Sequence, residues 1–384
     1  MKKLFTPLYF ACLFHACTVF GQDPHFSMFF ANPVYLNPAY AGFDLGTSIA
    51  LNHHEQWPGL PDGDLTASAT GYRTTNATVD YQLPCFFHSN RAKVGGALSV
   101  FYDGAGQAPL NTVGAGLALS YGHKFLLSNT RYFELRGGWQ ASVMQRSLHN
   151  NYFIYSDQLS PYYGLISDPS VLNLSSKAYF NHNAGFMVRF VQSRYTFWTV
   201  GLSASNLFRP DHSLRDAASI SVLPRRLTVH AGSTIALPVK NRSMLISPQL
   251  RWDTQADNKL NLVTGGFYFQ TNRIYIGPFF QGNFGNYKPT TPGQYTGSSP
   301  REVRTLSLSA GFDVISVFSH IDSWDQTRRR RYILGFTYDA SLTRLTTANT
   351  FGGIEINLRV NFTGDPKLSC TQLPVDTRRC PLLY

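Results

Sequence analysis

A strict alternation of side-chain type along short stretches limits how this chain can fold. In residues 113–121, valine, alanine, leucine and tyrosine side chains alternate with glycine, alanine and serine. Residues 198–205, 306–314 and 354–362 repeat the pattern, and in the last of these apolar residues alternate with Glu355, Asn357, Arg359 and Asn361. Successive side chains of a β-strand point to opposite faces, whereas a helix repeats every 3.6 residues. The alternation therefore predicts an all-β chain.

Fourteen candidate strands follow from this pattern, an even number that is typical of bacterial outer-membrane barrels. We expect antiparallel strands near residues 45–55, 64–74, 94–102, 112–122, 131–142, 182–191, 196–205, 226–236, 243–254, 258–270, 273–282, 304–314, 331–341 and 351–362. The stretch from Asn76 to Leu83 is an alternative position that adds or shifts a strand. An exported soluble sheet with one buried face would produce the same alternation, so the pattern alone does not specify a membrane barrel.

Composition and the N-terminus favour the membrane barrel. Charged and aromatic residues each form 14% of the chain and 31 residues are glycine, as expected for aromatic girdles around a lumen of small side chains. Lys2 and Lys3 precede a short apolar run, which predicts a cleaved secretory signal over residues 1–21. A lipoprotein signal that uses Cys17 is the alternative. Since no later run reaches the ~20 apolar residues of a spanning helix, we predict a β-barrel over residues 45–362.

Residues 22–44 form a segment of different character, in which Asn-Pro occurs twice, at Asn32-Pro33 and Asn37-Pro38. Proline disfavours helical geometry in the residue before it, so we expect an irregular, extended or turn-rich segment without a helix. The segment also carries five aromatic side chains, at Phe26, Phe29, Phe30, Tyr35 and Tyr40. We expect it on the periplasmic side, where it either docks on a partner or closes the inner mouth of the barrel.

The stretch from Gln22 to Gly42 resembles the N-terminal signature of the PorP/SprF family, outer-membrane proteins of the type IX secretion and gliding machinery of Bacteroidetes. It departs from the family pattern at Met28, where glutamine is common, and at Tyr40, where phenylalanine is expected. Residues 56–59, 153–158 and 201–207 are weaker family-like landmarks. The basic C-terminal end with its Cys-Pro pair is also similar to family members.

The resemblance implies a non-catalytic role in type IX secretion. It implies association with the periplasmic ring, which is built from a lipoprotein and its partner, with the translocon, and with secreted cargo that carries a C-terminal sorting domain. Family members linked to gliding handle a surface adhesin. The residues that we hypothesise to bind a partner are Pro24, His25, Phe26, Asn32, Pro33, Asn37 and Pro38. The alternative function is an outer-membrane transporter for small apolar or nutrient molecules.

The connections between strands predict an orientation. If the first strand starts in the periplasm, the long connections 142–181, 206–225 and 283–304 face outside, as is usual for such barrels. One inner connection, from Ser316 to Arg330, is also long and ends in Arg328, Arg329 and Arg330. These arginines are predicted to contact an acidic surface of a periplasmic partner or, alternatively, the phosphates of outer-membrane lipid.

The tail, residues 363–384, is expected in the periplasm, so both termini are placed there. Cys370 and Cys380 are close enough in sequence for a disulfide, which would leave Cys85 single.

Signatures of catalysis are absent from the sequence. His53 and His54 are adjacent, so a regular strand points them to opposite faces and they cannot share an ion. Neither a His-Glu-x-x-His nor a Gly-x-Ser-x-Gly motif occurs. The carboxylates Asp313, Asp339 and Glu355 are expected to join lumen ion pairs with residues such as Arg359, and acid catalysis would require the barrel to bring them together. We predict no enzyme activity, no metal, no cofactor and no nucleic-acid partner.

Overall fold

The computed structural model describes residues 23–58, 71–83, 91–106, 110–128, 130–148, 159–160, 164–165, 174–193, 195–214, 221–239, 242–255, 260–271, 273–283, 302–319, 330–342 and 347–362. Within these ranges, fourteen long strands form the wall of one closed antiparallel barrel. They are β1 (Thr47–Gln56), β2 (Tyr72–Leu83), β3 (Ala92–Ala105), β4 (Leu110–Leu126), β5 (Tyr132–Leu148), β9 (Tyr179–Ser193), β10 (Thr196–Ser205), β11 (Arg226–Val239), β12 (Arg242–Gln255), β13 (Leu260–Gln270), β14 (Ile274–Asn283), β15 (Glu302–Asp313), β16 (Arg330–Ser341) and β17 (Gly353–Phe362).

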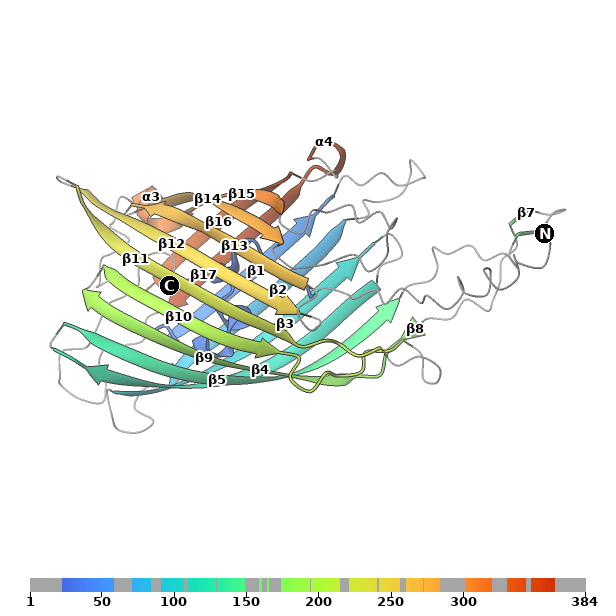
Figure 1. The fold of residues 1–384 in the computed structure, drawn as a ribbon, viewed down its shortest axis with the longest axis horizontal. Helices are drawn as coiled ribbons and strands as arrows, with labels where there is room; N and C mark the ends of the chain where they lie inside the picture. Colours follow the sequence, from blue (N-terminus) through green and yellow to red (C-terminus); the bar gives the residue numbers. More distant parts are fainter. Residues whose placement is uncertain are drawn as a thin grey trace, which may run out of the picture.

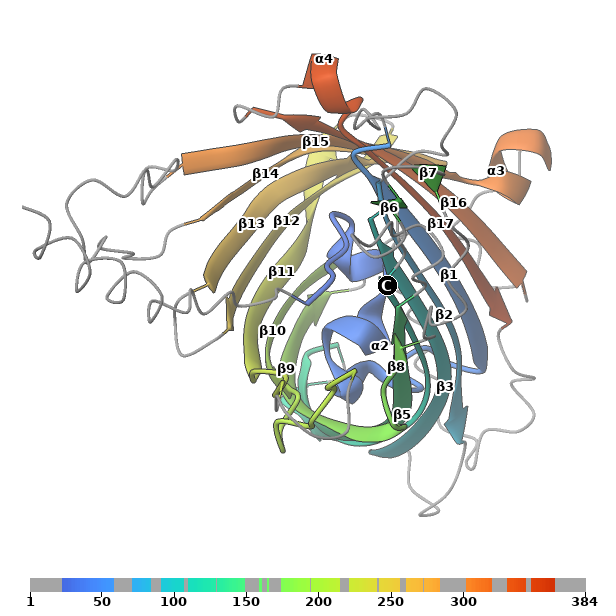
Figure 2. The same cartoon turned by 90° about the vertical axis from the view of Figure 1, so that its right-hand side faces the viewer.

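The barrel closes between its first and last strands. β1 pairs with β17 over its whole length, from Thr47 opposite Phe362 to Gln56 opposite Gly353. Every other wall strand pairs with its sequence neighbour in the wall, and β5 pairs with β9 across the long connection. Figures 1 and 2 show the resulting ring of tilted strands from the side and along its axis. The predicted fold class is therefore confirmed.

Side chains alternate between the lumen and the lipid-facing surface as the sequence predicted. On β4, Leu117 and Leu119 are each 50% exposed, whereas Ala118 and Ser120 between them are buried. On β17, Ile356 is exposed outward and its neighbours Glu355 and Asn357 are buried. The apolar outer surface and polar interior are those of a barrel in lipid.

The second strand was predicted wrongly. β2 occupies Tyr72–Leu83 instead of 64–74, close to the alternative position at 76–83. Its inward residues are polar, and its outward face begins with Arg73, Thr75 and Ala77 before Val79 and Tyr81, so it lacks an apolar alternation over its first half. Pairing with β1, which opposes Gln56 to Tyr72 and Thr47 to Tyr81, fixes this strand instead.

Several short elements lie outside the wall. β6 (Leu159–Ser160) pairs with β7 (Gly164–Leu165), and β8 (Leu174–Ser175) extends the edge of β5. The helices α3 (Val314–Ser319) and α4 (Thr347–Thr350) follow β15 and precede β17. None of the helices in the described ranges combines the length and the apolar character needed to cross a membrane.

The Asn-Pro segment contains three short helical turns, η1 (Phe29–Ala31), α2 (Pro33–Leu36) and η2 (Pro38–Tyr40). The prediction of no helix is therefore wrong. The restriction on the asparagines holds, because Asn37 is extended and Asn32 is also non-helical, and each is the N-cap of the next turn. Each proline then occupies the first helical position, where its fixed φ is favourable and its missing N–H is not needed.

Candidate functional site

The N-terminal segment, residues 23–46, fills the barrel lumen and is named here the lumen segment. Asp23 lies beside Asn206 and Gln255, next to the ends of β10 and β12. Asp44 accepts a hydrogen bond of 2.7 Å from Arg359, near the end of β17 at the opposite rim. The segment thus runs through the lumen from one end to the other, with α2 inside the ring of strands in Figure 2. The expectation that it lies only at the inner mouth is therefore wrong.

The end of the barrel near Asp23 is the one with the long connections. The connections 57–71, 149–178, 206–225 and 284–301 all leave this rim, whereas the opposite rim has one long connection, 314–329, and others as short as 194–195 and 240–241. In outer-membrane barrels the long connections are extracellular. This assigns Asp23 to the outer rim and Asp44 to the inner rim, opposite to the expected periplasmic position of the N-terminus.

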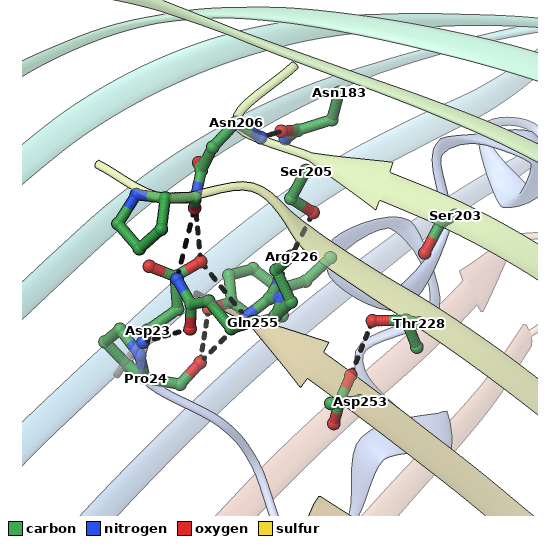
Figure 3. Close-up of polar contacts among 12 residues, drawn as sticks. Asp23, Pro24, Asn183, Ser203, Ser205, Asn206, Arg226, Thr228, Asp253 and Gln255 are labelled. Atoms are coloured by element: carbon green, nitrogen blue, oxygen red, sulfur yellow. Dashed lines mark hydrogen bonds and ion pairs between the residues drawn. The ribbon is translucent and has the colours of Figure 1, made fainter. Parts of the chain in front are cut away.

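Polar contacts hold the start of the lumen segment at the outer rim (Figure 3). The Asn206 side-chain amide donates to the Asp23 carboxylate at 2.9 Å, and the Arg226 guanidinium lies 3.7 Å from the same oxygen. The Asp23 backbone N–H donates to the Gln255 side chain at 3.1 Å. Arg226 also donates to the Pro24 carbonyl at 3.4 Å. The residue that follows β10 and the strands β11 and β12 therefore anchor this end of the segment.

Two buried carboxylates bind the backbone of the next residues. Glu355 accepts hydrogen bonds from the backbone N–H groups of Ser27, at 2.7 Å, and Met28, at 3.1 Å. Asp339 accepts from the Ser27 hydroxyl at 2.5 Å and lies 3.2 Å from Nε2 of His54. The barrel does bring Asp339 and Glu355 together, as acid catalysis would require, but each is hydrogen-bonded to the lumen segment. Asp313 lies apart from them, 3.8 Å from the Arg331 guanidinium.

His25 also lies in this cluster and its ring nitrogen is 2.6 Å from the side-chain amide of Gln281. Its role here is this hydrogen bond. Within the described ranges, no group of three His, Cys, Asp or Glu side chains is placed to hold a metal ion.

The middle of the segment is fixed by Asn37. Its side-chain amide donates to the carbonyl groups of Phe186, at 3.2 Å, and Leu202, at 3.3 Å, and lies 3.1 Å from Nε2 of His230. The wall has no side chain at Gly185, where a Cβ atom would lie 1.9 Å from the Asn37 side-chain oxygen. Three strands thus recognise this asparagine through backbone atoms and one histidine.

Arg136 on β5 binds the last turn of the segment and is fully buried. Its guanidinium donates to the carbonyl groups of Ala39, at 3.0 Å, and Ala41, at 2.9 Å, and to the Ser120 hydroxyl at 2.7 Å. It also forms an ion pair of 3.1 Å with Glu134 two residues earlier on the strand. Because a buried charge is costly unless it is paired and hydrogen-bonded, the segment and the ion pair stabilise each other.

Aromatic packing fills the remaining volume beside η1. Phe30 contacts Tyr268 with ring centroids 4.8 Å apart, and Phe29 contacts Phe279 at 6.4 Å. All four side chains are less than 5% exposed. Burying one such ring contributes about 1.5–3 kcal/mol, so this cluster is a main source of the stability of the filled lumen.

A cavity of about 380 Å³ remains between the lumen segment and the wall near the outer rim. The segment contributes Asp23, Pro24 and Tyr35, and the Tyr35 ring stacks on Phe101 of β3 at 5.8 Å. The other lining residues come from strands β2 to β5 and β9 to β11, and from Asn206, His212 and residues 221–224. The cavity is lined mainly by amide, hydroxyl and charged side chains.

The sequence-predicted partner residues therefore lie in two places. All seven residues of the Asn-Pro motifs and the stretch before them are inside the barrel: Pro24, His25, Phe26, Asn32, Pro33, Asn37 and Pro38. Arg330, the first residue of β16, is exposed at the inner rim and its guanidinium lies 5.9 Å from the Phe362 ring. Arg328, Arg329, Cys85, Cys370, Cys380 and the expected signal over residues 1–21 lie outside the described residues.

A comparison with protein families matches residues 18–360 to the type IX secretion system membrane protein PorP/SprF. The chain belongs to the PorP/SprF family. Its membership makes it a type IX secretion membrane protein, and the barrel fold with this family supports an outer-membrane location. None of the curated proteins searched matches the chain.

Solved structures of other barrels have low similarity to this PorP/SprF protein. A Pseudomonas aeruginosa FadL homologue is 13% identical, with a TM-score of 0.40 over 85% of this chain and 92% of that chain. The Pseudomonas putida toluene transporter TodX is 10% identical, with a TM-score of 0.39 over 89% and 98%. CdiB from Acinetobacter baumannii is 10% identical, with a TM-score of 0.40 over 82% and 60%. The fold of the PorP/SprF chain rests on its own strand pairing.

Sequence reasoning missed the charged wall residues that hold the lumen segment. Arg136, Arg226 and Arg251 were not singled out, although each contacts a backbone carbonyl of the segment. A signal was present, because Glu134 and Arg136, like Arg251 and Asp253, are opposite charges two residues apart on alternating strands. Such pairs share one face of a strand, and in a membrane barrel that face must be the lumen.

The path of the lumen segment predicts an extracellular N-terminus for this PorP/SprF protein. An epitope inserted directly before Asp23, behind the expected signal, should be detected by antibody on intact cells at a level close to that on permeabilised cells. The reason is that Asp23 lies at the rim with the long connections.

The matched control carries the same epitope between residues 240 and 241, in the short connection of β11 and β12 at the opposite rim. This epitope should be detected only after permeabilisation. The reverse pattern for the two epitopes would show that the barrel has the opposite orientation.

Proposed function

We propose that this protein is a non-catalytic component of type IX secretion that works as a closed scaffold in the outer membrane, and not as the conduit for secreted proteins. The observation that carries the proposal is the lumen segment, which occupies the interior from the outer to the inner rim. A folded or extended cargo chain has no path through a lumen whose centre is packed by buried side chains such as Phe30, Asn37 and Tyr40.

The inner rim is the surface that we propose for association with the periplasmic ring lipoprotein and its partner. Arg330 is exposed there, directly after Arg328 and Arg329 in the sequence, and α3 on the same connection exposes 76% of the Phe318 side chain. An exposed arginine and an exposed aromatic ring at the two ends of one connection suit an acidic partner surface with an apolar contact. Docking through the Asn-Pro motifs stays a hypothesis, and it would require the segment to leave the lumen.

The reception of cargo sorting domains and contact with the translocon also belong to this proposal. Both are suggested by the family, and the long connections at the outer rim are the surface that we propose for cargo. The alternative, a transporter for small apolar or nutrient molecules, is favoured by one observation, the cavity beside the outer rim. Transport through the barrel would require the lumen segment to move.

Reversing the charge of the inner-rim arginines should weaken ring association. In a variant with Arg328, Arg329 and Arg330 all changed to glutamate, co-purification of ring components with the tagged barrel should fall by at least about tenfold, because like charges across an interface cost several kcal/mol and about 1.4 kcal/mol is already tenfold. The measurement is quantitative mass spectrometry of an affinity pull-down from detergent-solubilised membranes.

The control for this experiment is Arg131→Glu, which reverses an exposed charge on the inner-rim connection between β4 and β5. It should leave ring association unchanged. Equal recovery of ring proteins by the triple variant and wild type would remove this surface from the proposal. If wild type recovered no ring protein, the proposed scaffold role would be wrong.

A further inference from the structure

Two opposite charges in the cavity beside the outer rim form no ion pair with each other. Asp103 on β3 and Arg146 on β5 both line it and are half-buried. Within the described ranges, the Arg146 guanidinium forms no hydrogen bond or ion pair, and the only hydrogen bond to the Asp103 carboxylate is one of 2.7 Å from the Thr74 hydroxyl. The other acid and base of the cavity, Asp23 and Arg226, are already paired with each other.

The register of the strands sets the spacing of the two charges. Asp103 opposes Thr112 on β4, and Thr112 in turn opposes Arg146. The two residues are therefore on the same level of the wall and separated by one strand, so their Cα atoms are about 10 Å apart. This spacing prevents the short Asp103 side chain from forming an ion pair with Arg146 without large bending of the arginine, and it leaves room for a ligand between them.

The remaining lining matches the groups of a peptide. Gln140, Asn181 and Asn183 present side-chain amides from β5 and β9. Their amide nitrogens donate to neighbouring side chains, whereas the Asn181 side-chain oxygen has no hydrogen-bond partner among the described residues and can accept from a peptide N–H. Met144 and Tyr179 add apolar surface on the same wall. The volume of about 380 Å³ is within the range of small-ligand pockets, which is about 300–1,000 Å³.

We propose that this cavity binds a short peptide with both termini free, whose carboxylate pairs with Arg146 and whose ammonium group pairs with Asp103. The charged ends of an extended dipeptide are roughly 6 Å apart, since a residue spans about 3.5 Å, and side chains reaching inward from positions about 10 Å apart contact both ends. The floor of the site is Tyr35 of the lumen segment, so a bound peptide contacts the segment that closes the barrel.

Calorimetry with the dipeptide Ala-Leu tests the proposal on the purified full-length mature barrel in detergent. Wild type should bind Ala-Leu saturably, and Arg146→Gln and Asp103→Asn should each weaken binding by about tenfold, because each removes one charge-assisted hydrogen bond. N-acetyl-Ala-Leu-amide, which has the same backbone without the charged ends, should show no saturable binding. Arg131→Gln, an exposed position on the inner-rim connection between β4 and β5, should bind Ala-Leu like wild type.

Specific results would overturn the proposal. These are the absence of saturable Ala-Leu binding to wild type, equally tight binding of the blocked peptide, and unchanged affinity in Arg146→Gln. Free leucine tests whether the ligand is a peptide, because its ammonium and carboxylate groups are closer together than those of a dipeptide. Leucine binding as tight as that of Ala-Leu would overturn the assignment to a peptide. Retained heat-modifiability on gels must show that each variant is a folded barrel.

Discussion

Deletion of residues 23–42 should turn a barrel of low conductance into an open pore. Barrels of about 8 strands are filled by their own side chains, whereas those of about 16 strands enclose a water-filled channel. With fourteen wall strands, this barrel lies near the channel-forming size, and the lumen segment supplies the filling. The single-channel conductance in planar bilayers should therefore rise by roughly tenfold or more on deletion.

A point substitution in the lumen segment provides an independent test. Ser27→Asp places a third carboxylate beside Asp339 and Glu355, and repulsion between buried like charges should displace this part of the segment and raise the frequency of channel openings. Ser27→Ala is the matched control, because it loses one hydrogen bond without adding a charge. A folded deletion variant that conducts no more than wild type would show that other parts of the chain close the barrel.

The strand pattern was predictable from sequence because lipid and lumen impose a local rule on each strand. Where the outer face is fully apolar, as at Val200 and Leu202 on β10, alternation located the strand correctly. It failed at β2, whose outward residues Arg73 and Thr75 lie near the outer rim, where lipid contact does not demand apolar side chains. There the position of the strand depends on its pairing with β1. The periodicity of a single strand carries no information about its pairing partner.

The position of the lumen segment was not predictable by the same reasoning. Its aromatic side chains and Asn-Pro pairs indicated a packed, irregular segment, but the choice between inner mouth and full lumen depends on contacts across the whole chain. Ser27 binds Glu355 across 328 residues, and Asn37 binds Leu202 across 165. No local pattern in the sequence encodes contacts between residues so far apart. The inward charge pairs of the wall strands are visible in the sequence, and they indicate that the lumen contains polar groups.

Glycines of the wall allow the strongest test of how the segment and the barrel fit together. At Gly95 a Cβ atom would lie 2.1 Å from the Ala41 carbonyl oxygen and 2.7 Å from the Gly42 Cα atom. Gly42 has a φ of +56°, a backbone conformation that favours glycine, so the chain cannot easily move there. Both contacts are with backbone atoms, so relief of the clash must displace the segment or the strand.

Gly95→Ala should therefore destabilise the barrel by about 3 kcal/mol or more, at the upper end of the cost of overpacking. The measurement is urea unfolding in detergent, followed by tryptophan fluorescence. Gly96→Ala is the matched control, because its Cβ atom would face outward with its nearest neighbour, Leu119, at 3.8 Å. This variant should change the free energy of unfolding by less than about 0.5 kcal/mol.

A second pair of adjacent glycines repeats the test on another strand. A Cβ atom at Gly138 would lie 2.4 Å from the backbone of Pro38 and Ala39, whereas one at Gly137 would have no atom within 4 Å. Gly138→Ala should resemble Gly95→Ala, and Gly137→Ala should resemble wild type. Equal changes in the free energy of unfolding within each pair would mean that the strand propensity of the new residue, and not contact with the lumen segment, determines the stability of the barrel. A loss confined to the inward glycines would mean that close contact with the lumen segment contributes to the stability of the barrel wall.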